Sequence, residues 1–496
     1  MRKLLVAVLV VLSIIQVPLQ AAYLTKVPQT LKQPDGTTLK CYATGDEFHS
    51  WLHDANDYTI IQNPETGYYV YAAKSGTRLV ATSWIAGMVN PAAVGLQPGL
   101  NLDPKEILSL SKSKFQIPKL KGTSGVATTG SINNIAIFIR FSDQQEFSNS
   151  LSAFNSAFNG SGDVSMDEYF KEVSGDQLSV TTSFYPGANN GVVVSYQDAN
   201  PRNYYCKYNA STNPIGYQTD AEAREREMVL LKEAVNALKS EIEASGLNFD
   251  NDGNKQIDNI CFIVKGGVGA WGDLLWPHMC ALYLFDVSIA GCRVWNYNFQ
   301  ISSVLGVSVL CHEMSHSISY PDLYRYYNRN INPVGQWDIM SLNANPPQHQ
   351  DVYTKLKYGQ WLTSIPEIST PGTYSLEPLS TNPFAAYKIA SPNSTTEFFV
   401  LEYRSQSGLF ESGLPGSGLI IYRVNTLANG NENGPVDEIY VFRPGGKPGE
   451  STTDNGNISQ AFFSAGSGRV SFNAADCFLS NGTPGGIEIT DIGTAG

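Results

Sequence analysis

Residues 301–316 read ISSVLGVSVLCHEMSH, an apolar segment that runs directly into two histidines and a glutamate. Positions i and i+4 lie on one face of an α-helix, so the imidazoles of His312 and His316 can bind a single metal ion. Glu313 would then reach a water molecule on that ion. A buried helix with two histidines in phase by chance is the alternative, but such polar groups are costly to bury unpaired. The H-E-x-x-H spacing therefore predicts a zinc-binding helix over residues 303–318.

A catalytic zinc ion needs a third protein ligand and one open position for water. Pro321 stops the helix, and Asp322 lies just past the resulting turn, where it could fold back onto the metal. A rival scheme takes a glutamate from a following helix, but no glutamate occurs between Glu313 and Glu367. Asp322 is therefore the predicted third ligand, and Asp338 is the fallback.

This set of ligands predicts hydrolysis by a metal-bound water. Zinc lowers the pKa of that water, and Glu313 would accept its proton during attack on a peptide carbonyl. Glu313 would then pass the proton to the leaving amine. A second donor to the oxyanion is expected from a tyrosine or a histidine. Among 26 tyrosines and six histidines the pattern selects none, and His278 and Tyr358 are the candidates.

These residues resemble the secreted metallopeptidases of the immune inhibitor A type, whose extended motif is H-E-x-x-H-x-x-G-x-x-D. The sequence departs from that motif at Ser319, where the family has glycine, and matches it at His312, Glu313, His316 and Asp322. Glycine adopts positive φ without steric cost, whereas another residue there costs about 1–2 kcal/mol. The departure predicts modest strain or a different turn at Ser319, and it removes no ligand.

The resemblance extends to two further segments. Residues 336–341 read QWDIMS and look like the family's tight turn beneath the metal, which implies that Met340 forms a hydrophobic floor. A methionine after a turn is otherwise most often core packing. Upstream, Trp276-Pro277-His278 resembles a segment that lines the cleft, with the tryptophan expected to pack rather than to catalyse.

Hydrophobic patterning predicts a mixed α/β catalytic domain over residues 126–365. Runs rich in β-branched and aromatic residues predict strands at 135–141, 178–181 and 260–264, and helices are expected near 166–172 and 220–245. The resemblance implies an α+β zincin fold for this domain. Residues 366–496 contain short alternating runs between glycine, proline and asparagine clusters, which predicts an all-β, sandwich-like carboxy-terminal domain.

The first residues indicate export. Arg2-Lys3 precede an apolar stretch over residues 4–12, and small residues follow at 21 and 22. This pattern predicts a cleavable signal peptide over residues 1–21 rather than a membrane span. The chain is expected to be secreted or exported, in the extracellular space, the periplasm or at the cell surface.

Residues 22–125 resemble the amino-terminal propeptide of the same family, on the stretches Gln33-Pro34-Asp35-Gly36 and Gly45-Asp46-Glu47. Residues 103–130 are rich in lysine, serine, threonine and glycine, which suits a cleavable linker. The resemblance implies a zymogen whose propeptide is an intramolecular inhibitor. Cys41 could cap the zinc as a thiolate, although an ordinary structural cysteine is the simpler interpretation.

Composition and net charge limit the classes of molecule that the protein is expected to bind. The 496 residues are 42% hydrophobic, enough for two or three cores, and the formal net charge is −12. This charge argues against nucleic acid or an anionic membrane surface as a partner. Protein or peptide substrates are the partners expected of a peptidase. Among seven cysteines, Cys280 with Cys292 is the predicted bridge in an exported protein.

Residues 248–258 read NFDNDGNKQID and could bind calcium. Calcium prefers clustered carboxylate and amide oxygens in a glycine-bent loop, and the candidate ligands are Asp250, Asp252, Asn254 and Asp258. The EF-hand pattern is met only in part, because Cys261 occupies the place of the closing glutamate. An ordinary polar turn has equal weight on spacing alone, and similar loops in relatives favour the metal.

The leading hypothesis is a secreted zinc-dependent endopeptidase made as a zymogen. A non-peptidase zinc hydrolase could use the same water chemistry, although a helical H-E-x-x-H is more frequent in peptidases. The alternative from a different functional class is a non-enzymatic extracellular protein for binding or adhesion, in which the zinc site is structural. Structural zinc normally has four protein ligands, whereas three are visible here.

Overall fold

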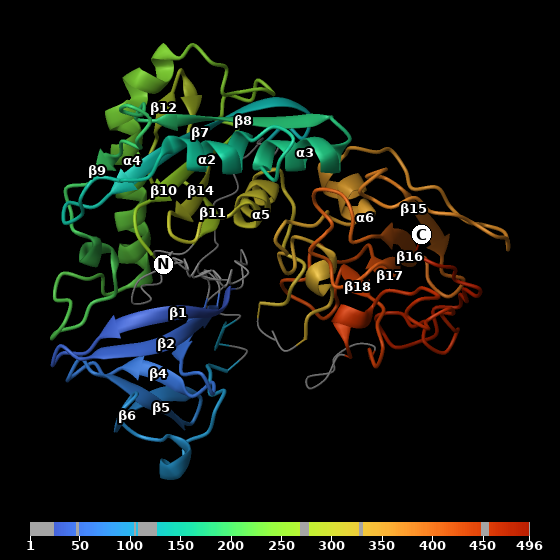
Figure 1. The fold of residues 1–496 in the computed structure, drawn as a ribbon, viewed down its shortest axis with the longest axis horizontal. Helices are drawn as coiled ribbons and strands as arrows, with labels where there is room; N and C mark the ends of the chain where they lie inside the picture. Colours follow the sequence, from blue (N-terminus) through green and yellow to red (C-terminus); the bar gives the residue numbers. More distant parts are fainter. Residues whose placement is uncertain are drawn as a thin grey trace, which may run out of the picture.

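The computed structural model describes residues 24–45, 49–103, 106–107, 126–267, 277–326, 331–447 and 456–495. Three regions follow one another along the chain: an amino-terminal sheet, a central α/β region and a carboxy-terminal sheet (Figure 1). The predicted signal peptide, most of the predicted linker and Trp276 lie outside the described residues. Within them, the helices lack the combination of length and apolar composition that crossing a membrane requires.

The amino-terminal region is a six-stranded antiparallel sheet in which each strand pairs with the next. Its strands are β1 (Leu24–Lys32), β2 (Thr38–Gly45), β3 (Ser50–His53), β4 (Thr59–Gln62), β5 (Tyr69–Ser75) and β6 (Arg78–Ile85), followed by the 3-10 turn η1 (Ala92–Val94). Cys41 is 3% exposed inside the core of this sheet, and burial raises the pKa of its thiol to about 11. Cys41 is therefore a core residue, and its interpretation as a thiolate cap on zinc is wrong.

The central sheet has the order β11-β14-β10-β7-β8, and the short strand β9 (Tyr196–Gln197) also pairs with β7. Four strands run parallel: β7 (Gly130–Arg140), β8 (Leu178–Tyr185), β10 (Ile260–Val264) and β14 (Asn296–Ile301). Strand β11 (His278–Ala281) lies at the edge and is antiparallel to β14. A separate hairpin joins β12 (Ser288–Ile289) to β13 (Cys292–Arg293).

Alternating side chains along β7 create two apolar cores on opposite faces of the sheet. Ile135 and Ile137 pack with helix α4 (Asp220–Ala244). Ala136 and Phe138 pack with α2 (Leu151–Asn159), α3 (Met166–Ser174) and α5 (Val307–Ser317). The predicted zinc-binding helix is thus α5, which begins at Val307 rather than 303 because Gly306 has extended backbone at its N-cap.

The carboxy-terminal region holds a four-stranded antiparallel sheet of β15 (Ala386–Ala390), β16 (Glu397–Arg404), β17 (Gly418–Asn425) and β18 (Ile439–Val441). One face packs on carboxy-terminal loops, whereas the other joins the core of α3 and α5, against which the turn η5 (Ile458–Gln460) also packs. In the described part of residues 366–496 the second layer consists of loops and isolated bridges, so the region differs from the predicted sandwich. Because one core crosses residue 365, the central and carboxy-terminal regions pack as a continuous body.

All seven cysteines lie in the described residues, and all are free thiols. Cys280 belongs to edge strand β11, whereas Cys292 lies in the hairpin with its Sγ 3.7 Å from Oδ2 of Asp250. The predicted bridge between them is wrong, because both residues are free thiols, each with its own surroundings.

Candidate metal centre

Helix α5 ends in a turn that leads the chain back toward its histidines. Ser319 has a φ of 78°, its N–H donates to the His316 carbonyl at 2.9 Å, and the Tyr320 N–H donates to the Ser315 carbonyl at 3.0 Å. These two bonds satisfy carbonyls at the helix end around a left-handed residue, a position usually taken by glycine. Ser319 therefore has the conformation that glycine would favour in the resembled motif, and the turn is kept at the cost of strain.

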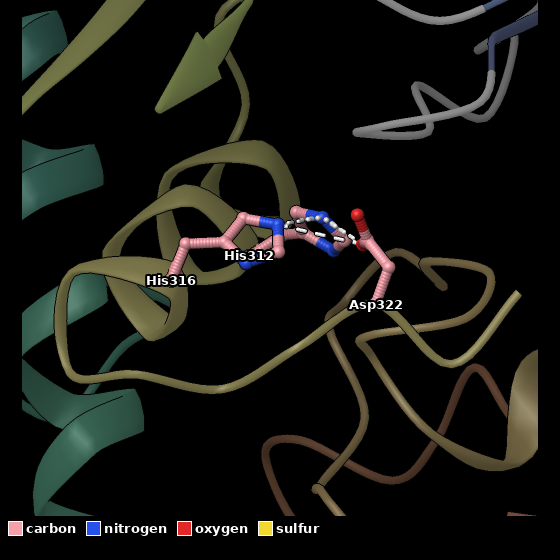
Figure 2. Close-up of side chains that lie close together, drawn as sticks. All are labelled: His312, His316 and Asp322. Atoms are coloured by element: carbon pink, nitrogen blue, oxygen red, sulfur yellow. Dashed lines mark hydrogen bonds and ion pairs between the residues drawn. The ribbon is translucent and has the colours of Figure 1, made fainter. Parts of the chain in front are cut away.

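The turn places Asp322 opposite both histidines (Figure 2). The Nε2 atoms of His312 and His316 are 3.1 Å apart, and Oδ1 of Asp322 is 3.2 Å from the first and 3.4 Å from the second. A tetrahedral zinc ion with bonds of about 2.0–2.2 Å would separate its ligand atoms by about 3.3–3.6 Å. The three predicted ligands therefore converge at separations close to those of a metal site.

Backbone carbonyls set the tautomers of both histidines. Nδ1 of His312 is 2.9 Å from the carbonyl of Ile339, and Nδ1 of His316 is 2.8 Å from the carbonyl of Tyr320. A carbonyl only accepts, so each Nδ1 carries a proton, and the lone pair available to a metal is that of Nε2 once this nitrogen is unprotonated. Oδ1 of Asp322 is buried without a hydrogen-bond donor among the described residues. Two facing lone pairs beside this oxygen fit a cation.

The group is enclosed, with His312 0%, Asp322 1% and Glu313 3% exposed. Burial acts to raise the pKa of Asp322, but the charge of His316 and the close approach of both imidazoles hold that pKa well below its usual value. Burial raises the pKa of Glu313, which the two histidines act to lower. The protein therefore keeps Asp322 ionised in a dry site, where its charge would attract a cation.

A tight turn beneath the helix supports His312. The Ile339 carbonyl that holds the ring precedes Met340, which is fully buried in the same core. Asp338 accepts the N–H of Met340 on Oδ1 and the N–H of Asp351 on Oδ2, both at 2.7 Å. Asp338 thus fixes the turn and is outside the metal group, so it is not needed as a fallback ligand.

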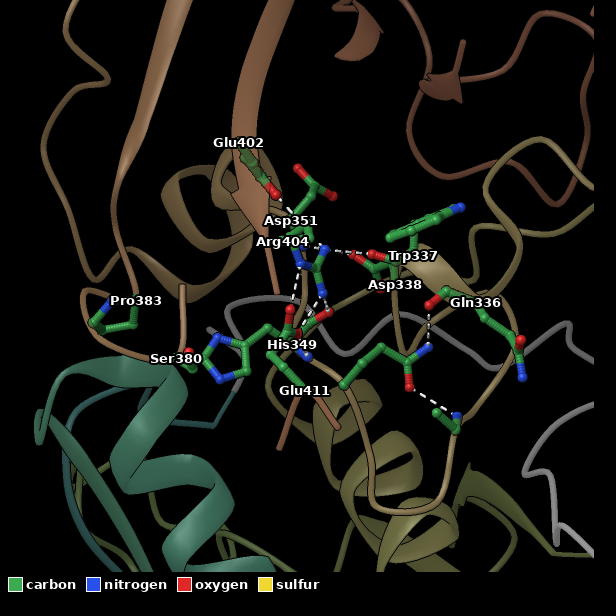
Figure 3. Close-up of polar contacts among 12 residues, drawn as sticks. Gln336, Trp337, Asp338, His349, Asp351, Ser380, Pro383, Glu402, Arg404 and Glu411 are labelled. Atoms are coloured by element: carbon green, nitrogen blue, oxygen red, sulfur yellow. Dashed lines mark hydrogen bonds and ion pairs between the residues drawn. The ribbon is translucent and has the colours of Figure 1, made fainter. Parts of the chain in front are cut away.

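The carboxy-terminal sheet holds the same turn from the other side (Figure 3). Arg404 of β16 is fully buried and donates from Nη1 to the Trp337 carbonyl at 2.6 Å. Its Nε and Nη2 bind the two carboxylate oxygens of Glu411 at 2.8 and 2.6 Å, and Nη2 also donates to the His349 carbonyl at 3.2 Å. Such a bidentate pair is among the stronger polar contacts in proteins. The short helix α6 (Val352–Thr354), the π-turn η4 (Lys355–Gly359) and the 3-10 turn η3 (Gly335–Trp337) complete this layer.

The two candidate oxyanion donors lie in different surroundings. His278 starts edge strand β11, has Nε2 3.0 Å from Oε1 of Glu227, and contributes to the pKa of Glu313. Tyr358 donates its hydroxyl to Oε2 of Glu438 at 2.7 Å. His278 is therefore near enough to Glu313, the predicted general base, to act on its pKa. The Tyr358 hydroxyl is instead hydrogen-bonded to a carboxylate of the carboxy-terminal region.

Three residues without a sequence signal contact Asp322. Tyr326 donates its hydroxyl to Oδ2 of Asp322 at 2.7 Å, which leaves Oδ1 to face the histidines. The Asn431 N–H donates to the Asp322 carbonyl at 2.8 Å, and the Asp322 N–H donates to Oε1 of Glu432 at 3.3 Å. A tyrosine shortly after the ligand could have been noticed locally, but no sequence pattern connects residue 322 with residues 431 and 432.

A second acidic group forms where the calcium loop was predicted. The carboxylates of Asp250, Asp252 and Asp258 have ligand atoms within 4.8 Å of one another. Asp258 is 1% exposed, and its Oδ1 and that of Asp250 have no hydrogen-bond donor among the described residues. Burial and the two neighbouring charges raise the pKa of Asp258 to about 6. Asn254 instead accepts the Gln256 N–H on Oδ1 at 2.7 Å.

Comparison with known proteins does not assign the chain to a family. No family model matches the sequence, and no curated protein matches it. Wild-type OgpA from Akkermansia muciniphila is similar at 11% sequence identity and a TM-score of 0.24, over 63% of this chain and 89% of that one. A TM-score this low does not indicate a shared fold.

Proposed function

We propose that this protein is a zinc-dependent endopeptidase whose metal is held by His312, His316 and Asp322. The observation that carries the proposal is the convergence of two imidazole nitrogens and one carboxylate oxygen beside Glu313, the next residue after the first histidine. Two neutral imidazoles and one carboxylate at tetrahedral separations favour zinc among divalent ions.

Glu313 is the proposed general base. It lies almost fully buried beside the ligands, where it can accept a proton from a water at the fourth position and return that proton to the leaving nitrogen. Zinc, when bound, lowers the pKa of that water and polarises the peptide carbonyl. Backbone carbonyls hold the Nδ1 protons of His312 and His316, so each ring would offer Nε2 to the metal, and Tyr326 orients Asp322 through Oδ2.

Strand β11 is the proposed binding edge for an extended peptide. It pairs with β14 along one side and, among the described residues, with no strand along the other. An exposed sheet edge can accept a peptide as an added strand through backbone hydrogen bonds. This strand begins at His278 and packs against helix α5, which carries Glu313, so a peptide bound there would pass close to the metal centre.

The zincin assignment, export and activation by removal of residues 22–125 belong to the same proposal. The signal-like start of the chain and the composition of residues 103–130 support them. The amino-terminal sheet has its own apolar core, which suits a separate inhibitory unit. It touches the central region through Gln62 Nε2 and Thr212 Oγ1 at 3.0 Å, among other contacts.

Calcium is the proposed occupant of the second acidic group. Hard oxygen ligands suit it, and two buried carboxylate oxygens there have no donor among the described residues. Asp250, Asp252 and Asp258 are the proposed protein ligands. Asn254, whose Oδ1 is bonded to the backbone, is left out of this set.

The experiment compares the full chain with its Glu313→Gln variant before and after limited proteolysis of the linker. Zinc content is measured on every sample, and casein hydrolysis is followed. The proposal expects one zinc per chain in both proteins and hydrolysis only by the cleaved parent. Equal hydrolysis by parent and variant would refute Glu313 as the base. Zinc without hydrolysis in either would favour the binding or adhesion protein, and ester hydrolysis alone would favour a non-peptidase zinc hydrolase.

A further inference from the structure

We infer that the loop of residues 426–438, between β17 and β18, is a built-in part of the metal centre that positions the third ligand. It would make metal binding depend on the carboxy-terminal region, which the sequence presents as a separate module. The inference concerns the metal site and does not require the protein to be a peptidase.

The segment that carries Asp322 has little structure of its own. All of residues 318–326 are described, and they form turns and bends with no helix or strand. Their first turn contains the strained Ser319. Yet Oδ1 of Asp322 is held between 3.2 and 3.4 Å from two nitrogens on a rigid helix. Placing a ligand on an irregular segment this closely requires contacts from outside it.

Asn431 supplies the first of these contacts. It is fully buried, and its backbone N–H donates to the Asp322 carbonyl at 2.8 Å. Its side-chain Nδ2 donates to the Leu323 carbonyl at 2.9 Å and to the Ile439 carbonyl at 2.8 Å, while Oδ1 accepts the Ile439 N–H at 3.1 Å. One amide therefore joins the ligand segment to the first residue of β18.

A buried ion pair supplies the second contact. Arg325 donates from Nε to Oδ1 of Asp437 at 2.8 Å and from Nη2 to Oδ2 at 2.5 Å. The two side chains are 3% and 2% exposed. Removing one partner of such a pair leaves a buried charge uncompensated, so the contact resists separation of the two segments.

The loop also reaches the ligand side chain through Tyr326. The Tyr326 N–H donates to the Glu432 carbonyl at 3.1 Å, and the Tyr326 hydroxyl donates to Oδ2 of Asp322 at 2.7 Å. Oδ2 is thereby fixed, and Oδ1 is turned toward the histidines. Partners of this kind, one bond removed from the metal, typically change metal affinity about 10- to 100-fold when removed.

The test compares Asn431→Ala with Asn213→Ala in the full chain. Asn213 is a matched control, because it is a buried asparagine of the central region whose Nδ2 donates to backbone carbonyls, those of Asn203 and Lys207 at 2.9 Å and that of Cys206 at 3.3 Å, outside both the ligand segment and the loop of residues 426–438. Zinc affinity is measured by chelator competition, and the absorption spectrum of the cobalt-substituted protein reports ligand geometry. Thermal stability is measured with chelator present.

The expected result is a zinc Kd weakened about 10- to 100-fold and an altered cobalt spectrum for Asn431→Ala only. Asn213→Ala should keep the parental Kd and spectrum even if it lowers the melting temperature equally. Parental affinity and spectrum in a folded Asn431→Ala protein would overturn the inference. If that variant fails to fold, Tyr326→Phe, which removes a single hydroxyl, must show the same two changes, and parental values there would also overturn it. Because the readout is metal binding, the inference can hold even if no peptidase activity is found.

Discussion

Ser319 offers a substitution whose effect can be worked out from one backbone angle. At a φ of 78° a non-glycine residue is strained by about 1–2 kcal/mol. Replacing Ser319 with glycine removes that strain but costs about 0.5–1 kcal/mol of extra backbone entropy in the unfolded chain. The side chain is exposed and makes no hydrogen bond within the described residues, so nothing else is lost. Ser319→Gly should therefore stabilise the protein by about 0.5–1 kcal/mol.

Urea unfolding followed by circular dichroism, with chelator present, measures this difference without a contribution from metal. The matched control is Ser156→Gly, on the exposed side of helix α2, where φ is helical and glycine should destabilise by about 0.5 kcal/mol. The opposite signs of the two serine-to-glycine changes isolate the backbone conformation as the cause. A Ser319→Gly protein that is less stable than the parent would refute the reasoning.

Three further predictions concern the ligands and the buried charges. Calcium should stabilise the folded protein at neutral pH by about 2.7 kcal/mol at a hundredfold excess over Kd, and so raise its melting temperature in calorimetry. Asp252→Asn should abolish this rise, and the rise should shrink below pH 6, since protons compete with calcium for Asp258, whose pKa is about 6. A parent protein whose melting temperature does not respond to calcium would contradict the site. Burial raises the pKa of Glu172 from 4.5 to about 7, so the folded state binds more protons than the unfolded state between these two pH values. The resulting contribution to folding stability is at most about 3 kcal/mol; it is present below pH 4.5 and is lost as the pH rises through 7. Glu172→Gln should flatten the fall in urea stability across that window, and an unchanged slope would count against the shift. Asp322→Asn should weaken zinc binding by more than the roughly 100-fold expected of an outer residue, measured by chelator competition; parental affinity would exclude Asp322 as a ligand.

Local patterns in the sequence were enough to predict the elements that carry the site. Apolar runs correctly placed the parallel strands β7, β8 and β10 of the central sheet but missed β14, and helical periodicity placed α4. The histidine pair, the turn at Pro321 and the glycine-like backbone of Ser319 all depend on residues close together in the chain. For the same reason Asp322 could be chosen over Asp338, and the structure brings only the former to the histidines.

Predictions that needed long-range information were the ones that failed. The bridge between Cys280 and Cys292 rested on their closeness in sequence, but both are free thiols, one on edge strand β11 and the other on the hairpin strand β13. The sandwich was inferred from alternation along strands, which does not reveal that one face of the sheet packs on α3 and α5. Asn431 and Asp437 hold the ligand segment through tertiary contacts. No local pattern encodes such contacts, because they arise only when the two regions pack together.

The central claim is that two imidazole nitrogens and one carboxylate oxygen hold a single zinc ion and leave one position for water. X-ray absorption at the zinc edge, on protein with a measured zinc content, tests it most directly. One zinc per chain with only nitrogen and oxygen neighbours, at about 2.0–2.2 Å, and a changed spectrum in Asp322→Asn is the predicted result. A sulfur neighbour at about 2.3 Å, a spectrum unaffected by Asp322→Asn, or no bound zinc would contradict the account.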